Sequence, residues 1–338
     1  MKDRNEREAF YSQSREEISS LLPDNPCKFY KLLESGQTVC EIELDLGVGE
    51  DAVEIAQITD CHVNSINGRD LKDPETPYTY KCRTAFRDRR TVAETVSALA
   101  ACEYSDATVV TGDILDYMTI SALDDVRTLF VEKYPDIMMT LGWHDMTKQM
   151  QTKRPNLISD EERIAILQQI WPHDIHYYSR DLGKRVTVIC LGMTIIAYSK
   201  DFSEQLLADI KRSREENRYI LIFQHEPLAT RLEKDREVTP SFTRTDGYGV
   251  LRNFCDGDRM IAGSLDTNAQ NLKIYDIIRS NADVIKGIFA GHYHNQFYTE
   301  IPAWYERDGV RVECSIPQHV AHIVLAKDRG YLVRIKVK

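Results

Sequence analysis

Three features that would assign the chain to a common class of protein are missing from its sequence. None of its eight cysteines forms a Cys-x-x-Cys pair, so we interpret them as reduced thiols packed mostly in the core. The longest apolar run, VTVICLGMTIIAY (186–198), is shorter than the about 20 residues that span a bilayer and predicts two consecutive buried strands. Basic residues are outnumbered, 43 against 53 acidic ones, which disfavours broad attraction to nucleic acid.

The N-terminal residues, MKDRNEREAFYSQSREE, also lack the apolar core of a secretory signal. We therefore expect a cytoplasmic protein with no membrane association. The content is that of a globular chain with a real core, because 42% of the residues are hydrophobic and 28% are charged. A length of 338 residues suits one large α/β domain or two ordinary ones.

Strand-like and helix-like patterns alternate along most of the chain. Residues 160–170 show the clearest helix start, because Ser159 is a suitable N-cap and Glu162 follows three positions later. Predicted strands lie at 38–46, 52–60, 107–113, 218–227 and 284–295, and predicted helices at 7–22, 82–102, 118–134 and 202–216. This alternation, closed by a strand-rich tail, predicts a layered α/β sandwich rather than two independent domains.

Two further divisions follow from the pattern. Residues 1–40 are predicted to form an N-terminal helical arm, and residues 41–338 the main domain. The polar segments 63–81 and 228–268 are long enough to serve as cap loops over a crevice.

Five predicted strands end on a cluster of polar residues. The clusters are QITDCH with Asp60 and His62, VVTGDILD with Asp113 and Asp116, MTLGWHD with His144 and Asp145, LIFQHEP with His225, and IFAGHYH with His292 and His294. Ligands of α/β sheets bind outside the carboxyl ends of the strands, so we expect the five clusters to converge on one crevice. Each cluster alone has an ordinary explanation as a turn or a packed histidine, but the set does not.

The residue types in these clusters favour a metal centre. Imidazole nitrogens mixed with carboxylate oxygens suit Zn, Mn or Fe better than Ca. His292 and His294 are two positions apart in an extended segment, so both side chains project to one side. More than four such ligands indicate two ions that share a bridging carboxylate, which is an arrangement able to clamp a phosphoryl group.

The order Asp-x-His, Gly-Asp-x-x-Asp, Gly-x-His-Asp, His, Gly-His-x-His over residues 55–295 resembles the calcineurin-like metallophosphoesterase superfamily. The resemblance implies an α/β, four-layer α/β/β/α sandwich with two mixed sheets and a dinuclear site for phosphate esters. It implies that Asp60, His62 and His294 bind the first ion, that Asp113 bridges, and that His225 and His292 bind the second. It further implies that His144 contacts the phosphate or protonates the leaving oxygen, oriented by Asp116.

One position departs from the family. Trp143 stands where the family has an Asn whose amide oxygen binds the second ion, and an indole N–H has no lone pair to offer. Three explanations stay open: water replaces the Asn at a weakened second site, the indole is a stacking wall for an aromatic or nucleoside group, or the second site is lost. A fourth reading, that Trp143 packs away from the ions, is compatible with the first and third.

The sequence therefore predicts a hydrolase that uses a metal-bound hydroxide on phosphate mono- or diesters of a small organic substrate, with two divalent or trivalent ions. Trp143, Asp145, Arg154 and Arg231 are candidate substrate contacts, and His319 and His322 are placed where they could face the crevice. The alternatives are a degenerate member that acts as a binding module, and a nuclease. The oligomeric state is not predicted.

Overall fold

The computed structural model describes residues 2–18, 26–72, 90–146, 159–194, 197–228, 243–245, 251–253, 269–294, 296–325 and 330–338. Its main strands form two mixed sheets, as the family resemblance implies. The first sheet has the order β1 (Arg15–Glu17), β2 (Lys28–Leu32), β3 (Thr38–Leu44), β15 (Tyr331–Val337), β4 (Val53–Ile58), β5 (Ala107–Thr111) and β6 (Met138–Thr140). The second has the order β13 (Phe297–Arg307), β14 (Val310–Val320), β12 (Ile285–Ala290), β9 (Tyr219–Gln224), β8 (Val186–Leu191) and β7 (Tyr177–Leu182).

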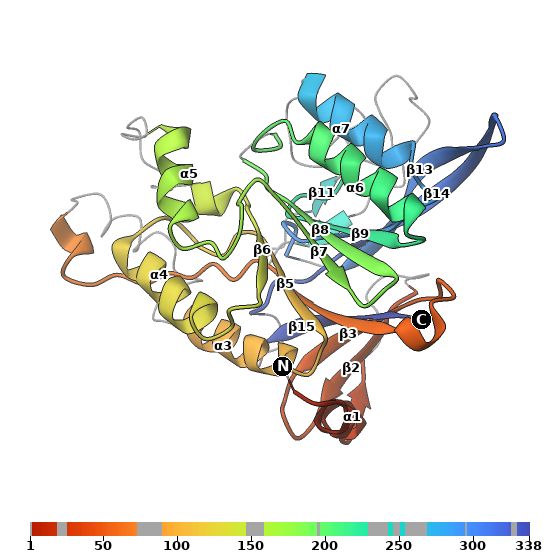
Figure 1. The fold of residues 1–338 in the computed structure, drawn as a ribbon. Coiled ribbons are helices and arrows are strands. Elements are labelled where there is room, and N and C mark those ends of the chain that lie inside the picture. Colours follow the sequence, from red (N-terminus) through yellow and green to blue (C-terminus); the bar gives the residue numbers. More distant parts are fainter. Residues whose placement is uncertain are drawn as a thin grey trace.

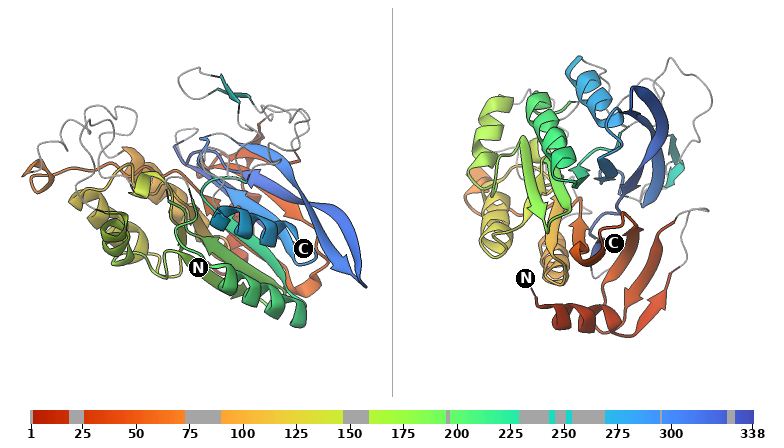
Figure 2. Two further views of the ribbon diagram at one scale, coloured as in Figure 1. Left: turned by 90° about the horizontal axis from the view of Figure 1, so that it is seen from above. Right: turned by 45° about the vertical axis from the view of Figure 1, so that its right-hand side comes forward.

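Helices cover the outer face of each sheet (Figures 1 and 2). The helices are α1 (Arg4–Ser12), α3 (Arg90–Cys102), α4 (Ile120–Asp125, continued by a π-helical turn over Val126–Val131), α5 (Asp160–Gln168), α6 (Ser203–Glu215) and α7 (Ala269–Arg279). Figure 1 shows α6 and α7 together over the second sheet, and α3 and α4 on the opposite side of the molecule. A separate two-stranded hairpin is formed by β10 (Thr243–Thr245) and β11 (Leu251–Asn253).

The core divides into three layers, because side chains alternate across each strand. On β9, Leu221 and Phe223 point into the cluster between the sheets, whereas Ile220 and Ile222 belong to the cluster under α6 and α7. A third cluster joins the first sheet to α3, α4 and α5. This is the α/β/β/α order of layers that the family resemblance implies.

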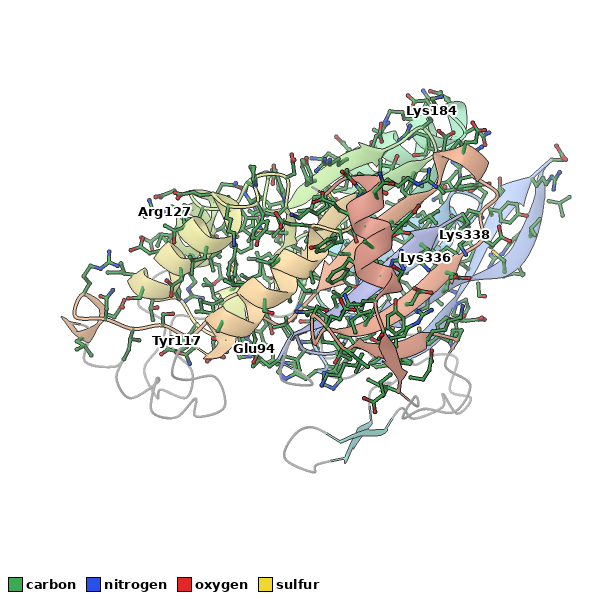
Figure 3. The ribbon with its side chains drawn as sticks, turned by 90° about the horizontal axis from the view of Figure 1, so that it is seen from below. Glu94, Tyr117, Arg127, Lys184, Lys336 and Lys338 are labelled. Carbon is green, nitrogen blue, oxygen red and sulfur yellow. The ribbon has the colours of Figure 1, made fainter. Side chains whose placement is uncertain are left out.

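The parallel strands of both sheets end at the same side of the molecule. β4, β5 and β6 run parallel in the first sheet, and β8, β9 and β12 run parallel in the second. β15 is antiparallel to β4, so its final residues mark the opposite side. Figure 3 shows Lys336 and Lys338 of β15 beside α1, away from Tyr117, which follows β5. The polar clusters thus meet at one edge of the sandwich.

The structure corrects three predictions about elements. The N-terminal helix is only α1, and residues 28–44 contribute β2 and β3 to the first sheet, so the segment 1–40 is not a helical arm. Within 186–198, the described residues form a strand only over Val186–Leu191; beyond it, Met193 and Tyr198 form an isolated bridge. β3 is almost wholly buried, although its alternating sequence predicts a half-exposed strand.

Other predictions agree with the structure or fall outside it. Ser159 and Glu162 form the expected capping box at the start of α5. Most of the proposed cap loops, 73–81 and nearly all of 229–268, lies outside the described residues. Among the described residues, no helix combines the length and apolar character needed to cross a bilayer.

Candidate metal centre

The structure brings the predicted ligands together in three overlapping groups. In each group one possible ligand atom per residue lies within 4.8 Å of the others. The groups are Asp60, His62 and His294; His62, Asp113 and His144; and Asp113, His225 and His292. Asp113 therefore stands between the two outer groups, which is the position that a bridging carboxylate needs.

The imidazole rings are oriented so that lone pairs face the centre. The Nδ1–H of His225 donates to the main-chain carbonyl of Thr111 at 2.8 Å, and Nδ1 of His62 lies 3.1 Å from the Asp116 carboxylate. These contacts direct the Nε2 atoms of both rings inward. Nε2 of His62 then faces Nε2 of His294 at 2.9 Å, and Nε2 of His225 faces Nδ1 of His292 at 3.3 Å. Paired nitrogens beside buried carboxylates fit a divalent ion.

The carboxylates of Asp60 and Asp113 give the centre a negative charge that would attract a cation. Burial opposes ionisation of Asp60, yet His294 and His225 hold the pKa of its carboxyl well below its ordinary value. Burial likewise opposes protonation of His225, but the Asp113 carboxylate, 3.1 Å from Nε2, raises its pKa to about 10. The Oδ1 atom of Asp60 is buried and makes no well-aligned hydrogen bond among the described residues, although Nε2 of His294 lies 3.2 Å from it. An ion at this point could bind both the carboxylate and the imidazole.

Glycines let the strand ends approach this closely. A Cβ on Gly291 would lie 1.8 Å from the Thr59 hydroxyl oxygen and 2.6 Å from an Asp60 carboxylate oxygen. A Cβ on Gly142 would lie 2.4 Å from the main-chain nitrogen of Asp113. Gly142 and Gly291 therefore have to be glycine, because any larger side chain would overlap the neighbouring strand end.

The backbone of the ligands is strained. Five of the six predicted ligands have a positive φ, a conformation that costs a non-glycine residue about 1–3 kcal/mol. The angles are 53° for Asp60, 44° for His62, 48° for Asp113, 74° for His292 and 54° for His294. The rest of the fold must stabilise these conformations, and strain of this kind is concentrated at functional sites.

His144 lies beside the centre and is held by Asp116, but not as predicted. Its Nδ1–H donates to the main-chain oxygen of Asp116 at 2.9 Å, while the Asp116 carboxylate is 3.6 Å away. That carboxylate instead bonds His62 and accepts from the side-chain amide of Asn64 at 3.0 Å. The carboxylate of Asp116 thus orients a ligand, and its backbone orients His144.

Trp143 lies on the rim of the centre. Its side chain is 39% exposed, and its ring plane is tilted by 30° to that of His292 with the centroids 6.5 Å apart. The reading in which this indole packs away from the ligands is therefore wrong. The indole borders the group that contains Asp113, His225 and His292.

Among the described residues, Asp145 and His319 do not face the centre as predicted. Asp145 is fully buried, and its two carboxylate oxygens accept from the backbone N–H groups of Leu115 and Gly142 at 2.8 and 2.9 Å. It fixes the turn that carries His144, so its predicted substrate contact is wrong. Arg154 and Arg231 lie outside the described residues. His319 packs on Phe289 instead of facing the centre.

Sequence reasoning missed three supporting residues. The Thr59 hydroxyl lies within hydrogen-bond distance of the Asp60 carboxylate and of the main-chain oxygen of Thr111, and can donate to either. The side-chain amide of Asn64 donates to the Asp116 carboxylate. Glu226 is buried next to His225, and burial raises the pKa of its carboxyl to about 8. All three are one or two positions from a predicted ligand, which is the signal that a search of the motif flanks would have used.

Comparison with known proteins places this geometry in a family. The calcineurin-like phosphoesterase family matches residues 53–296, which is more than half of the chain. No protein with a curated description matches. A dimetal phosphatase from Danio rerio is similar in structure, with 14% identity and a TM-score of 0.44 over 80% of this chain and 87% of that one.

A purple acid phosphatase from yellow lupin seeds is also similar in structure. Its identity is 10% and its TM-score 0.42, over 91% of this chain and 48% of the lupin chain. The phosphopantetheinyl hydrolase of Mycobacterium tuberculosis has 13% identity and a TM-score of 0.32, over 77% and 87% of the two chains. The family match over residues 53–296, which contains all six predicted ligands, is the decisive finding. The chain belongs to the calcineurin-like phosphoesterase family.

Proposed function

We propose that the protein hydrolyses phosphate mono- or diesters of a small organic molecule at a centre that holds two metal ions, Mn, Fe or Zn. The observation that carries this proposal is the convergence of the three overlapping groups of His and Asp side chains. Asp60, His62 and His294 would hold one ion, and His225 and His292 the other, with Asp113 between them.

Two bound ions supply charge neutralisation for the phosphoryl oxygens and a more acidic water. The chain's own residues do the rest. Asp113 is fixed by the main-chain N–H of His144, which donates to its Oδ1 at 2.7 Å. That contact couples the position of the carboxylate to the position of His144. The His144 side chain is partly exposed, and its Nε2 is the atom that would give a proton to the leaving oxygen.

Trp143 favours an ester that carries an aromatic or heteroaromatic group. An exposed indole beside His292 offers a flat apolar wall to an aromatic or heteroaromatic group of the ester. The same residue lacks the oxygen ligand of the family's Asn, so only Asp113, His225 and His292 would hold the second ion, which would be the weaker of the two. A weakened second ion also supports a rival function, a binding module without efficient turnover.

Metal content and hydrolysis decide between these functions. We expect the wild-type chain, loaded with Mn, to carry two ions and to hydrolyse bis(p-nitrophenyl) phosphate or p-nitrophenyl phosphate. Asp113→Asn should lose both ions and all activity, because Asp113 belongs to two of the three groups. Asp70→Asn is the matched control, since Asp70 is equally an interior carboxylate but bonds to Ile120 and Ser121 instead.

Full activity in Asp113→Asn would exclude the dinuclear centre. One ion in the wild type, with no hydrolysis of either ester, would favour the binding module.

A further inference from the structure

A second cluster of reactive groups lies in the core between the two sheets, outside the metal centre. Cys27 directly precedes β2, Cys40 lies on β3 and His319 on β14. Sγ of Cys27 is 3.5 Å from Nδ1 of His319. Both sulfurs belong to the apolar cluster that separates the sheets, and no step proposed for the metal centre uses them.

The two sulfurs are in contact with each other. Phe29 is paired with Cys40 across the antiparallel β2–β3 ladder, and Cys27 is two positions before Phe29. Residues two apart on an extended chain project to the same side, so the Cys27 and Cys40 side chains share a face. The Cys40 thiol donates a hydrogen bond to the Cys27 sulfur.

This environment stabilises the Cys27 thiolate. The hydrogen bond from Cys40 and the contact with His319 outweigh the opposing effect of burial and lower the pKa of Cys27 to about 6. Burial has the opposite result at Cys40, whose pKa is raised well above its ordinary value. The Cys27 sulfur is thus largely anionic at neutral pH, whereas Cys40 keeps its proton. A nucleophilic thiol and the thiol that resolves its oxidised form divide their roles in this way.

His319 is held firmly in place. Its ring stacks on Phe289 with the centroids 5.6 Å apart and the planes 10° from parallel, and it also lies against Tyr298 at 5.1 Å. A metal site is not the explanation for this cluster. Among the described residues, the groups with metal-like spacing all belong to the centre at the strand ends.

We propose that Cys27 and Cys40 are an oxidation site for hydrogen peroxide, in which Cys27 is the attacking sulfur, His319 holds its proton and Cys40 closes a disulfide. In the first step the Cys27 thiolate, with its proton held on Nδ1 of His319, attacks one peroxide oxygen. The S–O bond forms and the O–O bond breaks. The departing hydroxide takes the proton back from His319, which gives water and a sulfenic acid.

In the second step the Cys40 sulfur attacks the Cys27 sulfur. The S–S bond forms, the S–O bond breaks, and the leaving hydroxide takes the Cys40 proton to give a second water. The sulfur pair loses two electrons and the peroxide gains two, so the balance closes with peroxide as the oxidant.

The chain contains its own control thiol. Cys314 is exposed, whereas Cys27 is only 8% exposed, so access alone favours oxidation of Cys314. Burial, together with nearby acidic groups, raises the pKa of Cys314 despite a lowering effect of Lys286. The lower thiol pKa therefore favours oxidation of Cys27. Solvent access and thiol pKa thus predict opposite orders of oxidation for Cys27 and Cys314.

The test is oxidation of the full chain by a small excess of hydrogen peroxide at neutral pH, followed by alkylation and cleavage after glutamate. That cleavage puts Cys27 in fragment 18–34 and Cys40 in fragment 35–41, apart from Cys61. We expect these fragments to become linked at least about tenfold faster than Cys314 is oxidised. Cys40→Ser should stop at a sulfenic acid on Cys27 that dimedone traps.

His319→Asn should slow the oxidation of Cys27 by about tenfold and leave Cys314 unchanged. His173→Asn is the matched control, because His173 bonds to the main chain at Met139 and is not in the cluster. Oxidation of Cys314 before Cys27 in the wild type would overturn the proposal without any variant. An unchanged Cys27 rate in His319→Asn would overturn the role of His319, and a sulfenic acid that never forms the disulfide would overturn that of Cys40.

Discussion

At the scale of single residues, His144 differs from the six predicted ligands because it lies beside the centre, and its side chain is partly exposed. Its Nδ1–H is committed to Asp116, so only Nε2 is available to a substrate. We expect His144→Ala to keep both ions and to lower kcat by about 10²–10⁴. Metal analysis and turnover on p-nitrophenyl phosphate, with His176→Ala as a control outside the centre, check this. Loss of an ion would instead make His144 a ligand, as its group with His62 and Asp113 allows.

A second question at this scale is whether Trp143 lowers the affinity of the centre for the second ion. Trp143→Asn restores an oxygen ligand, and we expect the affinity of the second ion to rise by about 10–100-fold. Calorimetric titration with Mn measures the change. Trp143→Phe is the control, since it keeps an aromatic ring without adding a lone pair. Equal affinity in the wild type and Trp143→Asn would mean that the second ion does not use this position.

The role of Trp143 as a wall gives a separate prediction. Trp143→Ala should raise KM for bis(p-nitrophenyl) phosphate by about 2–10-fold, because a stacking contact contributes about 0.5–1.5 kcal/mol. The KM for glycerol phosphate, which has no ring, should stay the same. An equal rise for both esters would assign Trp143 to the metal centre instead of the substrate.

At the scale of elements, the sequence predicts the strand ends that carry the candidate ligands. Each of the five strand ends was identified by an apolar run followed by polar residues, and the start of α5 by Ser159 and Glu162. The positive φ angles at the ligands could not be predicted, because strain depends on how neighbouring strand ends meet. The close packing where β8 ends has no local signal either: a Cβ on Gly192 would lie 2.2 Å from the carbonyl oxygen of Ile175, so only glycine fits there.

Strand-end packing makes a prediction of its own. Gly291→Ala should destabilise the fold by about 1–3 kcal/mol and lower metal content, because its Cβ would overlap Thr59 and crowd Asp60. Gly68→Ala is the control, since a Cβ there would meet no heavy atom within 4 Å. Urea unfolding and metal analysis of both variants measure the two effects. A metal-replete and stable Gly291→Ala would contradict the close approach of β12 to β4.

At the scale of the whole molecule, the first sheet joins the two ends of the chain. β3 and β15 pair in parallel with Glu41 opposite Arg334, and this long-range pairing has no signal in the local sequence. The alternation of β3 predicts exposure at Glu41, but Lys336 and Arg334 cover it at 2.8 and 3.1 Å. Local pattern predicts which segments are strands and leaves open which strands become neighbours.

The ion pairs of Glu41 should make the molecule's stability depend on pH. Burial opposes ionisation of Glu41, but Lys336 and Arg334 outweigh it, so the folded-state pKa lies below the unfolded value. The folded state then binds fewer protons in this range, and the contribution is fully present above about pH 4.3 and is lost as the pH falls through the folded-state pKa. Glu41→Gln should therefore lower the free energy of unfolding by about 2 kcal/mol at neutral pH and by progressively less in acid.

Urea unfolding of the wild type and Glu41→Gln at about pH 7 and about pH 3.5 measures this difference. Glu43→Gln is the matched control two positions along the same strand, since its pair with Lys338 at 3.0 Å is solvent-exposed. An exposed pair contributes about 0–1 kcal/mol, so this variant should change little at either pH. If Glu41→Gln were as stable as Glu43→Gln at neutral pH, the covered ion pairs would not hold β15 to β3. The junction of β3 and β15 would then depend on their backbone ladder and on the apolar side chains that flank it.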